Sequence, residues 1–458
     1  MSEPERPTIF RAERVVLPDG VRPAAVHVAD GTIVRVTDYD DVPVGATVET
    51  FADAALLPGV VDSHVHINEP GRTEWEGFAS ATRAAAAGGV TTLVEMPLNA
   101  VPPTTTVAGL RAKAAAARVG IAVDVGFWGG VVPENTSELG ALWRAGVCGF
   151  KAFLAPSGVD EFEHVTESDL RAALPALATL DAPLLVHAEL PALLRPPADR
   201  SAAGRRRYAN YLATRPPEAE AGAIGLLIEL AAESGVHVHI VHLATAAALP
   251  AIERARAAGV RLTVETCPHY LHFAAEEIPD GRTEFKCAPP IRGHADREAL
   301  WAALGSGALD LIATDHSPCP PALKCAEAGD FLEAWGGIAS LQLGLSVAWT
   351  GAQPRGYGLP EIARWMSAAP ARLAGLPSKG AIAVGRDADL VAFDPDAGWT
   401  VDPRQLQHRH AVTPYAGARL TGLVRGTFVR GRCVFRDGVI QQEGTGRLLT
   451  GRGFNTRD

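Results

Sequence analysis

Apolar and polar positions follow two different patterns along the chain. In residues 7–56 they alternate over short stretches, which Asp-Gly pairs at 19–20 and 30–31 separate. That pattern is typical of strands joined by tight turns. The segment 380–440 shows the same alternation. Because chain ends often lie close together, we expect both segments to form one small β-sandwich domain. Two unrelated surface hairpins are the alternative.

Between these ends, apolar segments alternate with alanine-rich stretches of helical character, such as 76–89 and 218–235. Strands are expected near 56–61, 90–95, 121–127, 147–153, 183–187, 237–242, 261–265 and 310–314. Eight strands that alternate with helices over about 260 residues match the size of a (β/α)8 TIM-like barrel. A doubly wound open sheet is the alternative. The expected domains are the barrel over 57–378 and a composite β domain from 1–56 and 379–458.

Composition and charge exclude several classes of protein. The 458 residues carry a formal net charge of -10, so nucleic acid is not an expected partner. No apolar run has the length of a membrane helix, and the first residues lack the pattern of a secretory signal. The six cysteines contain no C-x-x-C pair. We therefore expect a cytoplasmic protein with no membrane partner.

Two further segments carry an expectation of their own. Residues 191–217 form a long insertion rich in proline and arginine, which predicts a functional or mobile loop. The tail 450–458 is expected to be frayed.

The first expected strand of the barrel ends in a pair of histidines. His64 and His66 are two residues apart, so their side chains lie on one face of a strand and can bind one metal ion. Asp62 shares this face and is a candidate for orienting a ligand. A hydrogen-bonded pair of surface histidines is the alternative.

Lysine is scarce in this chain. Lys and Arg total 42, yet only five are lysines: Lys113, Lys151, Lys286, Lys324 and Lys379. Lys151 stands in the apolar segment V-C-G-F-K-A-F-L, where a charged ammonium is poorly solvated. One interpretation is a salt bridge to a nearby carboxylate. The other is a neutral amine that reacts with carbon dioxide to give a carbamate, which can bridge two metal ions.

Three further strand ends carry polar candidates. His187 ends the fifth expected strand, and Asp315 follows the eighth. In the sixth, His242 is nearest the strand end and is the preferred ligand. His237 and His239 are expected in the core or at the opposite end of the barrel.

Ligand-type side chains thus stand at the carboxyl ends of five expected strands, which is where barrel enzymes build their active sites. A set of this kind suits two divalent transition metals. Its members are His64, His66, Lys151, His187, His242 and Asp315.

The motifs around these residues resemble the cyclic amidohydrolases, the branch of the amidohydrolase superfamily that holds dihydroorotase, hydantoinase (dihydropyrimidinase) and allantoinase. The shared marks are D-x-H-x-H at 62–66, E-P-G at 69–71, Lys151, His187, His242, T-D-H at 314–316 and G-R-D-A-D-L-V at 385–391. INEPGRTEWEGF, KCAPPIR and TDHSPCPP are most similar to segments of allantoinases.

The resemblance implies a dinuclear metal hydrolase that opens the hydantoin ring of allantoin to allantoate in purine degradation. It assigns His64, His66 and Asp315 to one metal and His187 and His242 to the other, with Lys151 bridging them as N6-carboxylysine. Asp315 is also the implied catalytic proton carrier. Zinc is the expected metal, with cobalt, manganese, nickel or iron as alternatives. A homotetramer is implied as well.

The resemblance also implies substrate contacts and separates neighbouring activities. The expected contacts are Asn68, Asn99, Cys287, Pro289 and Ser317. Hydantoinases carry a tyrosine where Pro156 stands, and dihydroorotases carry an arginine where Asn68 stands. A hydantoinase-type activity on another cyclic amide is the alternative, and a non-enzymatic scaffold is a third, less favoured one.

Some nearby side chains keep open or structural assignments. Arg72 could face the ureido group of the substrate or form a salt bridge, and the role of His269 stays open. Cys267 and Cys319 lack the spacing of thiolate sites and are expected to pack in the interior or in loops.

Overall fold

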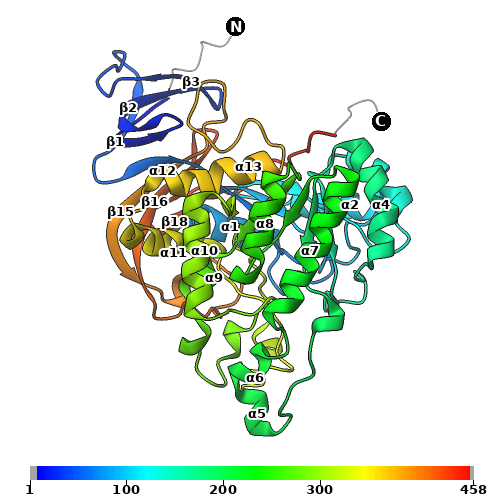
Figure 1. Ribbon diagram of the computed structural model, residues 1–458. Coiled ribbons are helices and arrows are strands. Elements are labelled where there is room, and N and C mark those ends of the chain that lie inside the picture. Colours follow the sequence, from blue (N-terminus) through cyan, green and yellow to red (C-terminus); the bar gives the residue numbers. More distant parts are fainter. Residues whose placement is uncertain (1–7, 454–458) are drawn as a thin grey trace.

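Strands from both ends of the chain share one mixed sheet, and two parallel sheets come between them in sequence (Figure 1). The computed structural model describes residues 8–453. The mixed sheet contains β1 (Thr8–Leu17), β2 (Gly20–Ala29), β3 (Thr32–Thr37), β4 (Thr47–Phe51), β5 (Ala55–Pro58), β15 (Leu390–Thr400), β16 (Arg419–Val429), β17 (Arg432–Arg436) and β18 (Val439–Ile440). The parallel sheets contain β6 (Val60–Val65), β7 (Val90–Glu95), β8 (Asp124–Phe127), β9 (Gly129–Gly130), β10 (Phe150–Phe153), β11 (Leu184–His187), β12 (Val238–Ile240), β13 (Leu262–Thr266) and β14 (Leu311–Ile312).

Helices follow most of the parallel strands and pack outside them (Figure 1). Their bounds are α1 (Phe78–Ala87), α2 (Val107–Ala117), α3 (Leu139–Arg144), α4 (Glu167–Leu180), α5 (Ala202–Arg206), α6 (Tyr208–Leu212), α7 (Pro217–Ser234), α8 (Leu249–Ala257), α9 (Pro268–His272), α10 (His294–Ser306), α11 (Gly344–Ala352), α12 (Leu359–Ala363) and α13 (Ala369–Leu373). The predicted helices at 76–89 and 218–235 are confirmed by α1 and α7. Pro217 at the first position of α7 and left-handed Gly235 after its last residue explain where that helix begins and ends.

The two chain ends share one sheet and one core. Strand β5 pairs with β1 on one side and with β15 on the other, which joins the amino-terminal strands to the carboxyl-terminal ones. Phe10 and Phe428 meet edge to face at 4.9 Å between ring centroids within a common apolar cluster. The Asp-Gly turn at 30–31 has positive φ at both residues, as a tight hairpin of this hand requires. The alternative of two unrelated hairpins is therefore excluded.

The β domain differs from the predicted sandwich in one respect. Its nine strands are hydrogen-bonded into one sheet. The reason is that β1 changes partners along its length: Thr8 to Ala12 pair with β4, and Val15 pairs with β5 beyond an irregularity in the strand. A change of partner within one strand depends on contacts distant in sequence, which the alternation of side chains does not encode.

The parallel sheets correspond closely to the predicted strands, and they meet at both edges. The chain passes from β8 to β9 through the single residue Trp128. At the other edge, the amide of His66 donates to the carbonyl of His316 at 2.8 Å, so the end of β6 lies beside the segment after β14. The expected α/β architecture with a β-rich domain is thus confirmed.

The insertion and the tail are more ordered than a mobile loop and a frayed end. Residues 191–217 contain α5 and α6, which project at the end of the molecule opposite both termini (Figure 1). The amide of Gly451 donates to the carbonyl of Gly146 at 2.8 Å, and Gly451 is buried. The prediction of a frayed tail is wrong for this residue, whereas its last part, 454–458, lies outside the described residues.

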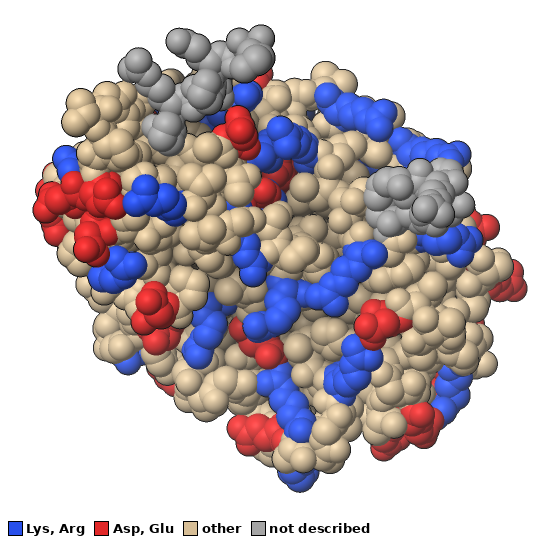
Figure 2. Space-filling model, turned by 90° about the horizontal axis from the view of Figure 1, so that it is seen from above, with Lys and Arg blue, Asp and Glu red and all other residues tan. Residues whose placement is uncertain are grey.

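Charged side chains are scattered among uncharged residues on the surface. On the face shown in Figure 2, Lys and Arg side chains form a band across the middle, with Asp and Glu mostly toward the rim. Within residues 8–453, no helix combines the length and the apolar content that crossing a membrane requires.

A buried lysine joins the β domain to the parallel strands. Lys379 donates to Asp124 at the start of β8 (2.6 Å) and to Asp389 just before β15 (2.7 Å), and it also pairs with Asp387 (2.9 Å). Burial alone lowers the pKa of Lys379, but Asp389 and Asp124 raise it above its ordinary value. This ammonium therefore stays charged and links the two parts.

Replacing Lys379 by methionine is expected to destabilise the protein by roughly 3–5 kcal/mol, because buried carboxylates lose their counter-charge. Urea denaturation measures the free energy of unfolding. Arg404→Met is the control, since it removes an ion pair to Asp402 whose arginine side chain is 84% exposed. Equal unfolding midpoints for Lys379→Met and the parent protein would contradict the assignment.

Candidate metal centre

The predicted ligands come together at the carboxyl ends of the parallel strands. His64 lies on β6, Lys151 on β10, and His187 is the last residue of β11. His242 and Asp315 follow β12 and β14 within three residues. All are buried, and the imidazole of His64 lies 5.4 Å from that of His242 between ring centroids. One compact cluster therefore collects nitrogen and oxygen atoms from five strands.

The first half of the cluster surrounds one oxygen atom. Oδ1 of Asp315 lies 3.1 Å from Nε2 of His64 and 3.3 Å from Nε2 of His66. Burial alone raises the pKa of Asp315, but the histidines lower it well below its usual range, so it is a carboxylate. These three side chains are grouped closely enough to hold one metal ion.

A buried carboxylate decides which nitrogen of His64 faces the metal position. Oε1 of Glu265 lies 2.5 Å from Nδ1 of His64, and Oε2 accepts from Nε2 of His239 at 3.0 Å. Burial alone raises the pKa of Glu265, but His64 and His239 lower it to about 2. The ionised carboxylate holds the His64 proton on Nδ1, so Nε2 presents a lone pair to Asp315. Nε2 of His64 and Oδ1 of Asp315 are both acceptors and lie 3.1 Å apart, which suits two ligands of one cation.

The second half consists of two imidazoles. Nδ1 of His187 lies 3.0 Å from Nε2 of His242. Nε2 of His187 donates to Glu189 at 2.7 Å, which leaves its Nδ1 as a lone pair. Nδ1 of His242 has no hydrogen-bond partner. The two facing nitrogens suit a second metal ion.

Lys151 lies between these halves and has no partner. Its ammonium nitrogen is buried and makes no hydrogen bond, and it lies 4.9 Å from the ring centroid of Phe153. Burial lowers the pKa of Lys151 to about 7, an effect that Glu265 and Asp315 only partly offset. An unpaired amine in the interior is costly unless something else binds it. The salt bridge considered for Lys151 does not form.

The other four lysines show how this chain normally treats a buried ammonium. Lys113 pairs with Glu95, and Lys379 with aspartates. Lys286 and Lys324 donate to backbone carbonyls of residues 332–337. Among the lysines, all of which lie in the described part of the chain, Lys151 alone lacks an acceptor.

Four non-glycine residues of the site have left-handed backbone conformations. Their φ values are 65° at Asn68, 66° at Asn99, 42° at His242 and 47° at Asp315. Such conformations are uncommon outside glycine and concentrate at functional sites. The turn at His242 also explains its position: β12 ends at Ile240, so regular strand alternation no longer applies.

A cavity of about 760 Å³ opens over the cluster. Among the expected substrate contacts, Asn99, Cys287 and Ser317 line it, and Ser317 donates to Asp315 at 3.2 Å. Asn68 and Pro289 do not line it. The Asn68 amide donates to the carbonyl of Pro318 at 3.3 Å, and the carbonyl of Pro289 accepts from Tyr270 at 2.6 Å.

The outer wall of the cavity is cationic. The insertion contributes four of its arginines to this wall, so it covers the site. They are Arg195, Arg200, Arg205 and Arg215. Lys286 lines the same wall, and Glu333 is the acidic residue beside it.

Two roles were open for Arg72, a contact with the substrate and a salt bridge, and the structure shows the salt bridge. It pairs with Glu161 and donates to the carbonyl of Asn99 at 2.7 Å, so it holds the loop that carries Asn99.

Asp62 differs from the prediction that it orients a metal ligand. It accepts from the amides of His64 and Thr314, both at 3.2 Å, and therefore joins the strand ends while Glu265 orients the imidazole.

The remaining histidines and cysteines are not among the predicted ligands, although Cys267 and His269 are grouped with Asp315 closely enough to hold a metal ion. His239 contacts Thr263 and Glu265 in the core, as expected, and His237 contacts Thr263 at 2.7 Å. His269 is fully buried, does not line the cavity and has no partner for either ring nitrogen. All six cysteines are unpaired.

The carboxylates that support the ligands, Glu265 and Glu189, were not among the predicted site residues. Glu265 stands in the apolar strand R-L-T-V-E-T, the same signal that drew attention to Lys151. Glu189 follows His187 by two residues, the spacing that places side chains on one face. Both signals were present in the sequence and would have found these residues.

Comparisons with known proteins agree with this geometry. The model of the amidohydrolase family matches residues 55–434. The chain belongs to the amidohydrolase family. An allantoinase from Streptomyces avermitilis is 52% identical to this amidohydrolase, over 96% of this chain and 98% of the relative. An allantoinase from Arabidopsis thaliana is 45% identical, over 95% of this chain and 90% of the relative.

The similarity extends to a solved structure. The L-hydantoinase (dihydropyrimidinase) from Arthrobacter aurescens aligns with a TM-score of 0.91 at 31% identity. The alignment covers 97% of this chain and 99% of that one.

Glu265→Gln in this amidohydrolase is expected to weaken binding of one metal by roughly 10–100-fold, because a neutral amide no longer fixes the proton on His64. Isothermal titration calorimetry of the metal-stripped protein with zinc measures this affinity. Glu298→Gln, at a half-exposed carboxylate paired with Arg355, is the control. Unaltered zinc affinity in Glu265→Gln would show that the carboxylate does not support the site.

Proposed function

We propose that this protein is an allantoinase, which adds water across one amide bond of the hydantoin ring of allantoin and releases allantoate in purine degradation. The observation that carries this proposal is the cluster of His64, His66, His187, His242 and Asp315 around an unpaired lysine. The 52% identity to an allantoinase along nearly the whole chain supports the choice of substrate.

We infer that the two parallel sheets form one (β/α)8 barrel. Hydrogen bonding at His66–His316 and the continuity of β8 with β9 support a closed ring of strands, which disfavours the open sheet. The proposed domains are the barrel over 57–378 and the β domain from 1–56 and 379–458.

Two divalent metals fit the donor set. His64, His66 and Asp315 would hold one, and His187 and His242 the other; zinc is proposed because imidazole and carboxylate ligands suit it. Bound there, the metals would lower the pKa of a water molecule and polarise the ring carbonyl.

Lys151 is the proposed bridge. Its ammonium would first lose a proton, and the neutral nitrogen would then form a bond to the carbon of carbon dioxide and release a second proton, which leaves a carbamate carboxylate in place of the buried cation. This reaction would remove the unfavourable burial of an unpaired ammonium and would supply carboxylate oxygens to the metals. No other lysine has a nitrogen free for it, because each already donates to a carboxylate or a carbonyl.

Asp315 is the proposed proton carrier. It borders the cavity and accepts from Ser317, so it lies beside the position of a reacting ring. It would take a proton from the attacking water and deliver it to the ring nitrogen as the carbon–nitrogen bond breaks. The oxygen of water stays on the carbonyl carbon, which becomes the carboxylate of the product.

Asn99, Ser317 and the backbone at Cys287 are the proposed substrate contacts. Pro156 lines the cavity where hydantoinases carry a tyrosine, which favours allantoin over other hydantoins. We also propose a homotetramer, from the family resemblance, and a cytoplasmic location, which six unpaired cysteines support.

Incubation of the metal-loaded protein with allantoin, hydantoin, dihydrouracil and dihydroorotate, one at a time, tests the substrate. Ring opening confined largely to allantoin is expected, because Pro156 and Asn68 replace the residues that serve the other rings. Ring opening is followed by absorbance or chromatography. Preferred turnover of hydantoin or dihydrouracil would favour the hydantoinase-type alternative, in line with the similarity to L-hydantoinase.

Lys151→Ala is expected to lose turnover of allantoin, because no carboxylate then bridges the metals. A short-chain carboxylate such as propionate should partly restore the rate by occupying the vacated space. Lys286→Met is the matched control: it removes another lysine of the site, and propionate should not improve its rate. Full turnover by Lys151→Ala with its metals bound would exclude the bridging role.

A further inference from the structure

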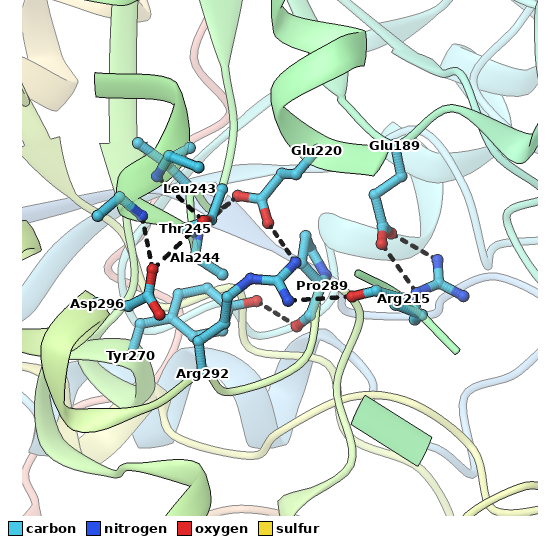
Figure 3. A network of polar contacts seen from close by, with 12 residues as sticks. Glu189, Arg215, Glu220, Leu243, Ala244, Thr245, Tyr270, Pro289, Arg292 and Asp296 are labelled. Atoms are coloured by element: carbon cyan, nitrogen blue, oxygen red, sulfur yellow. Dashed lines mark hydrogen bonds and ion pairs between the residues drawn. The ribbon is translucent and has the colours of Figure 1, made fainter. Parts of the chain in front are cut away.

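A network of charged side chains contacts His187 and the backbone after His242. Figure 3 shows this network. Its centre consists of two glutamate–arginine pairs, Glu189 with Arg215 and Glu220 with Arg292. The side chains of both glutamates and of Arg292 are at most 3% exposed. None of these residues is a proposed metal ligand.

The first pair fixes the ring of His187. Glu189 accepts from Nε2 of that ring at 2.7 Å. Arg215 binds the same carboxylate through two nitrogens, at 3.0 and 2.5 Å. Two parallel hydrogen bonds from a planar guanidinium fix the orientation of the Glu189 carboxylate. The carboxylate in turn fixes the His187 ring that donates to it.

The second pair fixes the backbone after His242. Oε1 of Glu220 accepts from the amides of Ala244 and Thr245, at 2.7 and 3.1 Å. Arg292 binds the other oxygen of that carboxylate at 3.0 Å. His242 has a φ of 42°, so contacts just after it help to hold an uncommon conformation.

The two pairs are joined to each other. Arg292 also donates to the backbone carbonyl of Arg215 at 3.0 Å, as the dashed lines of Figure 3 show. Arg215 is the last arginine of the 191–217 insertion, and Glu220 lies in the first turn of α7. The network therefore connects the insertion that covers the cavity to both histidines.

Stability alone does not explain three buried charges paired with each other and with the part-buried Arg215. Replacing a buried ion pair by apolar side chains of similar volume is often neutral or even stabilising. What apolar side chains cannot do is accept from the His187 ring and from two backbone amides. Orientation of the ligands is the property that needs these charges.

We propose that Arg215 and Arg292 are positioning residues for the second metal position, formed by His187 and His242. The first position does not depend on them, because Glu265 orients His64 there. This inference rests on the proposed two-metal function. It assigns the insertion a role in metal binding as well as in covering the site.

The test uses Arg215→Met in the full-length chain. The protein is stripped of metal with a chelator and titrated with Co²⁺, while visible absorption and the metal bound per chain are recorded. The second Co²⁺ is expected to bind about 10–100-fold more weakly than in the parent protein, and the first with unchanged affinity.

Arg256→Met is the matched control. Arg256 pairs with Asp310, which accepts from the amide of Val264, so the chemistry is the same. The two arginine side chains are also almost equally exposed, at 21% for Arg256 and 20% for Arg215. Arg256 lies at the amino ends of the strands, far from the ligands in the fold, and Arg256→Met should bind both metals normally.

Arg215→Lys keeps the charge without the two parallel hydrogen bonds, and it covers the case in which Arg215→Met does not fold. It should weaken the second metal less than methionine does. Both metals binding to these variants as they bind to the parent protein would overturn the inference. If the parent protein itself binds fewer than two metals, the proposed function fails, and that failure is seen before any variant is measured.

Discussion

The structure depends on one constraint: hydrogen-bond acceptor atoms of its histidines and of one aspartate are buried close to one another. Nε2 of His64 faces a carboxylate oxygen of Asp315, and Nδ1 of His187 faces a nitrogen of His242. Lys151 lies among them without an acceptor. Left alone, such a cluster is unfavourable in a dry interior. The proposed pair of metal ions and the proposed lysine carbamate would satisfy every one of these atoms.

The surrounding protein keeps these atoms in place. Glu265 and Glu189 hold protons on the outer nitrogens of two histidines, and Glu220 holds the chain after a third. Arg72 and its partner Glu161 secure the loop of Asn99. The ion pairs and hydrogen bonds around the site thus hold its geometry.

Local pattern was enough to predict most of the elements, because strand alternation and helical spacing are properties of neighbouring residues. It also located Lys151, since a lysine between phenylalanines conflicts with its surroundings. The apolar strand around Glu265 marked that carboxylate, but its pairing with His64, 201 residues away in sequence, could not be predicted in this way. Asn68 and Pro289 matched family motifs, but a motif does not tell whether a side chain reaches the cavity. The continuous sheet of the β domain depends on one strand changing partners, which is likewise non-local.

The central claim is that Lys151 carries a carbamate, and carbon-13 NMR tests it most directly. The metal-loaded protein is equilibrated with carbon-13-labelled bicarbonate, and the spectrum is compared with that of a Lys151→Arg variant treated in the same way. The account predicts a slowly exchanging carbamate resonance in the parent protein that is missing in the variant. A parent protein that holds both metals and hydrolyses allantoin, yet gives no carbamate resonance, would contradict it.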